Sequence, residues 1–389
     1  MNLRAMRRRR IAAALSCAVS LSACGAQRDG TTAPPASTES VDVTEVARGL
    51  EHPWAVALLD DGSFLVTERP GRLRRVSAQG AISAPIRGVP AVWAHGQGGL
   101  LDVELAPDFA RSHRLYFSYA EAGPDGSAGT AAAMATLDGD TLRDVRVIYR
   151  QQPKLVGPNH FGSRIAFDRS GHVFITQGER FSYRIYAQQL DKLQGKLVRL
   201  NLDGGIPGDN PFVDRKDARP EIWSYGHRNM QGLAVDPRTG TLWESEHGPR
   251  GGDEINLPRG GRNYGWPIAS YGMDYSTGTP YPETRGTHVA GTEQPLKYWK
   301  KSPGLSGMAF YVGHPQSPWN NSLFLGALAD RNLIRLSLDG DRIVGEDRLL
   351  TDLDARIRDV RVARDGSVYV LTDEDNGRLL RLQPPSAAH

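Results

Sequence analysis

The sequence has little cysteine, almost no net charge beyond its first 23 residues and no long apolar run after them. Its two cysteines, Cys17 and Cys24, both lie near the N-terminus. Residues 1–23 hold five arginines and no acid, which leaves 42 basic and 44 acidic residues in the rest. That balance excludes a nucleic-acid binder by charge. No later run is long enough to span a bilayer as a helix.

The N-terminus predicts an export signal. A basic segment through Arg10 precedes an apolar run from Ile11 to Val19 and then Leu21-Ser22-Ala23-Cys24, which resembles the lipobox of bacterial lipoproteins. Cleavage before Cys24 would remove Cys17, exclude an intrachain disulfide and free Cys24 for lipid attachment. We therefore expect an exported, periplasmic lipoprotein anchored through Cys24, with plain secretion and an incidental Cys24 as the alternative. Residues 24–40 are expected to form a flexible tether, because Thr, Ala, Pro and Ser dominate them.

The remainder, residues 41–385, predicts an all-β fold, and its 43 glycines and 25 prolines suit a turn-rich chain. One type of unit occurs six times: a turn of Asp, Asn or Gly, a short β-branched or aromatic run, then polar residues. Radial repetition of such units predicts a six-bladed β-propeller. An irregular β-sandwich is the alternative. The units are Asp60–Val76, Ser112–Glu121, Arg169–Glu179, Arg238–Gly248, Asn320–Leu336 and Arg364–Leu382.

Polar residues gather at the ends of these units or in the loops beside them. The largest gap between units, from Gly248 to Asn320, predicts long inserted loops, which often carry function. Since a propeller brings such loops together around its axis, we expect one polar, net-positive pocket containing a single histidine base. The residues concerned are Gln97, Asn159, His160, Arg228, Asn229, Glu246–Asn256, Arg356 and Arg358.

Three of these residues, Arg228, Arg356 and Arg358, favour an anionic ligand, because a guanidinium group fits a carboxylate in bidentate fashion. The alternative is that Arg356 and Arg358 form surface ion pairs with Asp359 or Asp352.

His160 is a candidate general base, because the ordinary pKa of imidazole lies near neutral pH. Asn159 or a backbone carbonyl could fix its tautomer. A purely structural histidine is the alternative.

The stretch "HGPRGGDEIN", residues 247–256, offers backbone carbonyls and carboxylates to a hard cation such as calcium. It lacks the ligand spacing of an EF-hand and the Lys-Ser/Thr ending of a phosphate-binding loop. An ordinary turn between two blades is the alternative.

Together these motifs resemble the soluble, pyrroloquinoline-quinone-dependent aldose (glucose/sorbosone) dehydrogenases. The likeness covers nearly the whole chain after the tether. It is carried by "LEHPWAVALLDDGSFLVTERPGRL", "GQGGLLDVELAPDF", "NHFGSRIAFD", "LDKLQGKLVRL", "EIWSYGHRN", "EHGPRGGDEINLPRGGRNYGWP", "GTEQPLKYW", "SGMAFY" and "RIRDVRVARDGSVYVLTDE".

The resemblance implies an oxidoreductase that holds pyrroloquinoline quinone (PQQ) and Ca²⁺ in the central depression of a six-bladed propeller and oxidises an aldose at its anomeric carbon. His160 matches the base that removes the proton of the anomeric hydroxyl. Arg228 matches the arginine that stabilises negative charge on the quinone oxygen. The cofactor contacts match Gln97, Asn159, His160, Arg228, Asn229, Arg356 and Arg358.

The same resemblance implies two calcium sites. Gly248 and Pro249 match the residues whose carbonyls hold the calcium that bridges to the quinone. Glu254 and Tyr264 match backbone ligands of a second, structural calcium. Gly226 is expected to allow a tight exit from a strand, so that Arg228 and Asn229 face the depression.

Two positions depart from the family pattern. Ala329 stands where a lysine usually contacts the quinone, and we expect Arg331 to compensate from the same loop. Asn159 stands where glucose dehydrogenases have an aspartate before the base.

Two other functions remain open at this stage. One is a propeller that only binds a ligand, which Ala329 favours. The other is a metal-dependent sugar lactonase, which would need acidic ligands around the channel. No Cys-x-x-Cys-His haem motif occurs, so the electron acceptor is expected to be external.

Overall fold

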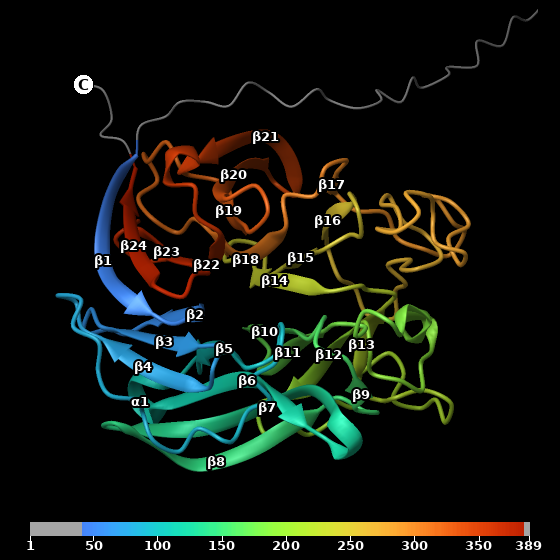
Figure 1. Cartoon of the computed structure of the whole chain (residues 1–389), viewed down its shortest axis with the longest axis horizontal. Coiled ribbons are helices and arrows are strands. Elements are labelled where there is room, and N and C mark those ends of the chain that lie inside the picture. The colour runs from blue at the N-terminus through green and yellow to red at the C-terminus, as the bar shows by residue number, and fades with distance from the viewer. Residues whose placement is uncertain (1–40, 385–389) are drawn as a thin grey trace, which may run out of the picture. The chain divides into compact units, whose positions relative to one another are not determined.

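The computed structural model describes residues 41–384, which form six small antiparallel sheets around one axis (Figure 1). The six-bladed β-propeller is thereby confirmed. The expected signal segment and tether, residues 1–23 and 24–40, lie outside the described residues. Within residues 41–384, no helix is long and apolar enough to cross a membrane.

The first three blades follow one another along the chain. Blade 1 contains β2 (Pro53–Leu58), β3 (Phe64–Glu68) and β4 (Arg72–Val76). Blade 2 contains β5 (Leu100–Leu105), β6 (Arg114–Ala122), β7 (Ser127–Asp138) and β8 (Thr141–Arg150), and β9 (Leu155–Val156) pairs with β7. Blade 3 contains β10 (Gly162–Phe167), β11 (His172–Gln177), β12 (Lys196–Asn201) and β13 (Ile222–Tyr225).

The last three blades each have four strands. Blade 4 contains β14 (Met230–Val235), β15 (Leu242–Glu246), β16 (Asp253–Asn256) and β17 (Lys297–Trp299). Blade 5 contains β18 (Leu305–Phe310), β19 (Ser322–Ala327), β20 (Asn332–Asp339) and β21 (Arg342–Leu349). Blade 6 contains β22 (Ile357–Val362), β23 (Val368–Thr372), β24 (Gly377–Gln383) and β1 (Asp42–Leu50).

Helix is confined to four short segments in the described chain: α1 (Phe109–Ser112) and the 3₁₀ turns Pro124–Gly126, Arg184–Gln188 and Thr351–Leu353. Each of the six sequence units contains the second strand of one blade. Blade 1 departs from the expected four strands, because the segment after β4 makes only isolated bridges. Pro85 and Pro90 in that segment have no N–H to donate to a fourth strand.

Strand β1 closes the ring by pairing with β24, so the two ends of the described chain share one blade (Figure 1). The hydrophobic core lies between neighbouring blades. Leu50, Val56, Phe64 and Leu371, for example, pack between blades 6 and 1 and are buried. Each blade thus depends on its neighbour for burial of its faces. The expected inserted loop connects β16 to β17, at residues 257–296.

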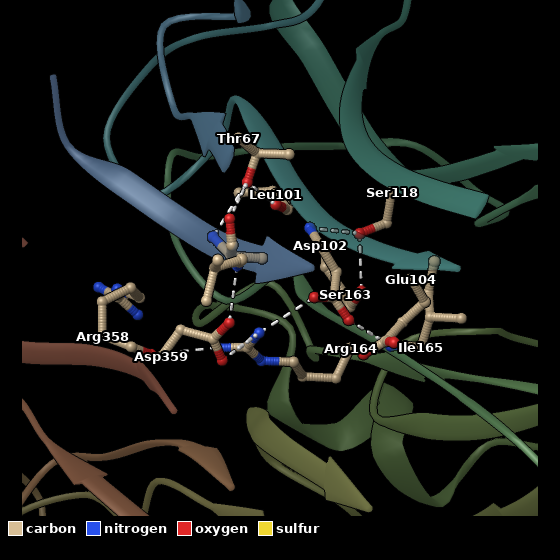
Figure 2. A network of polar contacts seen from close by, with 12 residues as sticks. Thr67, Leu101, Asp102, Glu104, Ser118, Ser163, Arg164, Ile165, Arg358 and Asp359 are labelled. Carbon is tan, nitrogen blue, oxygen red and sulfur yellow. Dashed lines mark hydrogen bonds and ion pairs between the residues drawn. The ribbon is translucent and has the colours of Figure 1, made fainter. Parts of the chain in front are cut away.

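A buried arginine holds the blades together at the axis (Figure 2). Nη1 of Arg164, on β10, lies 3.1 Å from Asp102 Oδ1 of blade 2 and 2.9 Å from Asp359 Oδ1 of blade 6. Its Nε donates to the Gln231 carbonyl of blade 4 at 2.8 Å. Its guanidinium lies 4.1 Å from the ring centroid of Trp54 in blade 1. One side chain of blade 3 therefore contacts four other blades.

Candidate active site

A cavity of about 240 Å³ opens over the axis, lined by residues from all six blades. It brings together three of the predicted cofactor residues, Gln97, Arg356 and Arg358. His247, from the predicted stretch Glu246–Asn256, also lines it. Four further lining residues were not predicted as ligand contacts: Arg69, Gln231, Ala329 and Asp373.

The predicted arginines of blade 6 share one carboxylate. Nη2 of Arg358 lies 2.7 Å from Asp373 Oδ2, and Nη2 of Arg356 lies 3.5 Å from the same oxygen. Burial raises the pKa of Asp373, but the charge and hydrogen bond of Arg358, with smaller contributions from His52 and Arg356, together hold that pKa well below its usual range. The alternative pairing of these arginines with Asp359 or Asp352 is therefore wrong. Asp359 instead pairs with Arg164.

His160 follows β9 and is held from both sides. Its backbone N–H donates to Gln97 Oε1 at 2.8 Å, and its Nδ1 lies 2.5 Å from Glu179 Oε2. Burial lowers the pKa of His160, although the charge of Glu179 opposes this. Burial raises the pKa of Glu179, but His160, the charge of Arg228 and the Phe181 N–H together lower it below its usual value. A neutral imidazole that donates from Nδ1 to this carboxylate keeps Nε2 as an acceptor.

The expectation that Asn159 or a carbonyl orients the ring is wrong, since Glu179 does so. The side chain of Asn159 makes no hydrogen bond to residues 41–384, and its carbonyl accepts from Arg180 Nη1 at 2.6 Å. Arg180 and Phe181 both have positive φ, 67° and 62°. Such backbone strain in non-glycine residues is concentrated at functional sites. Phe181 is 43% exposed, and its ring meets the His160 ring edge-on at 5.1 Å.

Gly226 turns the chain between β13 and β14, as expected. It has φ of 77°, and a Cβ there would lie 2.1 Å from Asn263 Oδ1. Arg228 Nη1 then donates to the carbonyls of His247 and Gly248 at 2.9 and 2.6 Å. Asn229 is buried, and its Oδ1 accepts from the Gly162 backbone N–H at 3.1 Å. Arg228 thus lines a smaller, neighbouring cavity and not the central one. Asn229 lines neither and instead holds Gly162 in the wall of the central cavity, so the expectation that both side chains face the central depression is wrong.

A second, smaller cavity of about 20 Å³ adjoins the first through His247, which lines both. All four predicted calcium residues line it: Gly248, Pro249, Glu254 and Tyr264. A space of this size holds one water-sized particle. The structure therefore places the residues assigned to two calcium sites around a single small cavity.

Buried carboxylates surround that cavity. Glu246 and Glu254 line it, and Glu244 lies behind them, where its Oε1 is 3.7 Å from His227 Nδ1. Burial and the charge of Glu246 raise the pKa of both Glu244 and Glu254 well above the usual range. Oε2 of Glu244 is buried without a hydrogen-bond partner in the described chain. A hard cation would relieve this charge, so the donor set fits Ca²⁺.

Gly248 remains compatible with a cation although its carbonyl accepts from Arg228, because a carbonyl has two lone pairs. The hydroxyl of Tyr264 donates to the Leu257 carbonyl at 2.5 Å, so its contribution to a metal would come from another atom.

Two further expectations are corrected. The histidine that lines the central cavity is His247, whose Nε2 lies 2.5 Å from the Leu305 carbonyl, whereas His160 lies behind the lining residues Gln97 and Phe161. Burial lowers the pKa of His247 to about 4, so it is neutral at physiological pH. Arg331 does not line the cavity. It pairs with Asp354 Oδ1 at 2.6 Å and is 42% exposed, so it does not replace a cation at Ala329.

Comparison with known proteins agrees with this architecture. Residues 50–381 match the Glucose / Sorbosone dehydrogenase family model. The chain is 54% identical over 352 residues to the aldose sugar dehydrogenase YliI of Escherichia coli strain K12, covering 90% of this chain and 94% of that protein. The fold and the site thus define the protein as a six-bladed propeller with a basic axial cavity. The chain belongs to the glucose/sorbosone dehydrogenase family, whose members are oxidoreductases.

Solved structures show the same likeness. The apo form of the soluble aldose sugar dehydrogenase of E. coli matches with a TM-score of 0.86 at 54% identity, covering 89% of this chain and 100% of that one. The PQQ-bound form of an aldose sugar dehydrogenase of Streptomyces coelicolor matches with a TM-score of 0.74 at 29% identity, covering 90% of this chain and 100% of that one.

Proposed function

We propose that this protein oxidises aldose sugars at the anomeric carbon to the lactone, using PQQ and Ca²⁺. The observation that carries the proposal is the buried His160–Glu179 pair beside a cavity with three arginines. The relative whose PQQ-bound form is solved supports PQQ as the cofactor. When bound, the quinone supplies the acceptor for the hydride of the anomeric carbon.

Residues of this chain would prepare the sugar for that transfer. Nε2 of His160 takes the proton of the anomeric hydroxyl, and Glu179 stabilises the imidazolium that results. The exposed ring of Phe181 gives the sugar an apolar surface next to the base. The carbon loses a hydride and the oxygen a proton, which leaves the lactone C=O.

The remaining predicted residues would hold the cofactor. Arg356 and Arg358 would bind its carboxylates, and Arg228 would stabilise negative charge that develops on it. Glu246 and Glu254, with the Gly248 and Pro249 carbonyls, would hold Ca²⁺. The arginines around the central cavity weigh against a lactonase, which needs acidic ligands there.

Dye-linked aldose oxidation by the chain from Val41 onward tests the proposal, with PQQ and Ca²⁺ added together and each omitted in turn. We expect activity only with both, and a loss of roughly 10²- to 10⁴-fold in His160→Ala. PQQ binding without any aldose oxidation would instead indicate a propeller that only binds. Lactone hydrolysis without oxidation would indicate the lactonase.

We also propose export and lipid anchoring through Cys24, supported by the lipobox-like sequence before it. Cys24→Ser is expected to move the protein from the membrane fraction to the soluble periplasm and to abolish labelling with palmitate. A labelled Cys24→Ser protein would contradict the anchor.

A further inference from the structure

Arg69 lies in the turn between β3 and β4 of blade 1 and lines the central cavity together with Arg356 and Arg358 of blade 6. Its backbone is fixed on both sides. Its N–H donates to the His52 carbonyl at 3.1 Å, and its carbonyl accepts from Leu100 N at 3.0 Å. The backbone of Arg69 is therefore held between the bend that precedes β2 and the start of β5.

Gly99, at the start of blade 2, makes room for Arg69. A Cβ at Gly99 would lie 2.0 Å from the Arg69 carbonyl oxygen and 2.6 Å from its Cγ. Gly99 also has a φ of 149°, a backbone conformation that residues other than glycine rarely adopt. The last glycine of "GQGG", Gly99, therefore allows the close approach of Arg69 from the preceding blade.

The guanidinium of Arg69 differs from its two neighbours in having no internal partner. Arg356 and Arg358 both pair with Asp373, whereas the side chain of Arg69 makes no hydrogen bond or ion pair within residues 41–384. Burial and the charges of Arg358 and Arg356 lower the pKa of Arg69, and Asp373 opposes this only in part. Three guanidinium groups thus face one carboxylate, and the cavity has a positive excess that an anion would neutralise.

We propose that Arg69 is a third anion-binding arginine of the cavity and binds a carboxylate of the cofactor. This role rests on the proposed function. It also accounts for Ala329, whose methyl group lines the same cavity and adds no charge to it. Arg69, and not Arg331, supplies the cation that the loop at Ala329 lacks.

The test is equilibrium binding of PQQ, with Ca²⁺, to the chain from Val41 onward, followed by quenching of tryptophan fluorescence. Arg69→Ala is expected to weaken binding by about tenfold to a hundredfold, because a charged hydrogen bond is lost. Arg69→Lys should recover part of the affinity, since lysine keeps the charge without the fork. Ala329→Lys in the Arg69→Ala background should also restore binding.

Arg331→Ala is the matched control, because Arg331 is exposed and paired with Asp354 outside the cavity. It should bind PQQ as the unaltered chain does. Arg69→Gln keeps most of the side-chain volume, and its unfolding midpoint should match that of the unaltered chain. Unchanged affinity in both Arg69→Ala and Arg69→Gln would overturn the role of Arg69 alone. No PQQ binding by the unaltered chain would overturn the proposed function as well.

Discussion

His160 and Glu179 form the pair on which the proposed chemistry depends. Because burial lowers the pKa of His160, the acidic limb of kcat/KM against pH should fall below the ordinary imidazole value of about 6.5. The base is active when neutral, so activity is kept above that limb and lost as pH falls through it. A limb at or above the ordinary value would contradict the assignment.

Glu179→Gln gives a sharper version of this test. The Glu179 charge raises the pKa of His160, so its removal should move the acidic limb to still lower pH while kcat falls through loss of orientation. Ser182→Ala, three residues along the same loop, is the control and should leave the limb in place. An upward movement in Glu179→Gln would show that the carboxylate does not act on the base.

At the residue scale, the sequence predicted some of the residues that gather at the axis, but not their contacts. Arg356 and Arg358 line the central cavity, as predicted, whereas Arg228 lines the smaller cavity and His160 lies behind Gln97 in the wall. Glu179 was missed because it reaches the base through a tight turn with two left-handed residues, Arg180 and Phe181, which no periodic pattern reveals. Arg69 was missed because the sequence "RPG", residues 69–71, is typical of an ordinary turn.

The connection from β13 to β14 is the element that presents Arg228. Gly226→Ala should destabilise the fold by more than about 1 kcal/mol and weaken PQQ binding, because its Cβ would lie 2.1 Å from Asn263 Oδ1. Gly240→Ala is the matched control. It has a similar φ of 79°, with nothing within 4 Å of the added Cβ, so it should cost only about 1 kcal/mol.

Urea unfolding and PQQ titration measure the two effects. Equal losses of stability in Gly226→Ala and Gly240→Ala would mean that the close approach at Gly226 is unimportant. A normal PQQ affinity in Gly226→Ala would mean that this turn does not position Arg228.

Second strands were the elements predicted best from sequence, because turn residues mark their starts in five of the six blades, whereas α1 precedes β6 in blade 2. Strand β11, for example, follows the turn at Gly171. The absence of a fourth strand from blade 1 was not predicted, because the repeated sequence pattern marks only the second strand of a blade and the third strand that pairs with it. Its absence depends on where Pro85 and Pro90 fall relative to the sheet edge.

The whole ring depends on the axial contacts of Arg164. Arg164→Met should lower the free energy of unfolding by about 3–5 kcal/mol, because Asp102 and Asp359, both fully buried, would keep only the more distant Arg361 as a shared cation. Arg143→Met removes an ion pair with Asp138 in which both side chains are more than 60% exposed, and should cost about 0–1 kcal/mol. Similar urea midpoints for the two variants would contradict this account of the axis.

The six-bladed architecture followed from the sequence because its repeat is a property of the whole chain. The axial network did not, since Arg164, Asp102 and Asp359 are far apart in sequence and come from three blades. Closure of the propeller brings these three residues together, and no local sequence pattern predicts that contact.

Anaerobic mixing of an aldose such as glucose with the chain loaded with PQQ and Ca²⁺ tests the central claim most directly. The account predicts reduction of the bound quinone by one equivalent of sugar, with one equivalent of lactone formed, and a far slower reaction in His160→Ala. Bound quinone that stays oxidised in the presence of every aldose tried would contradict it.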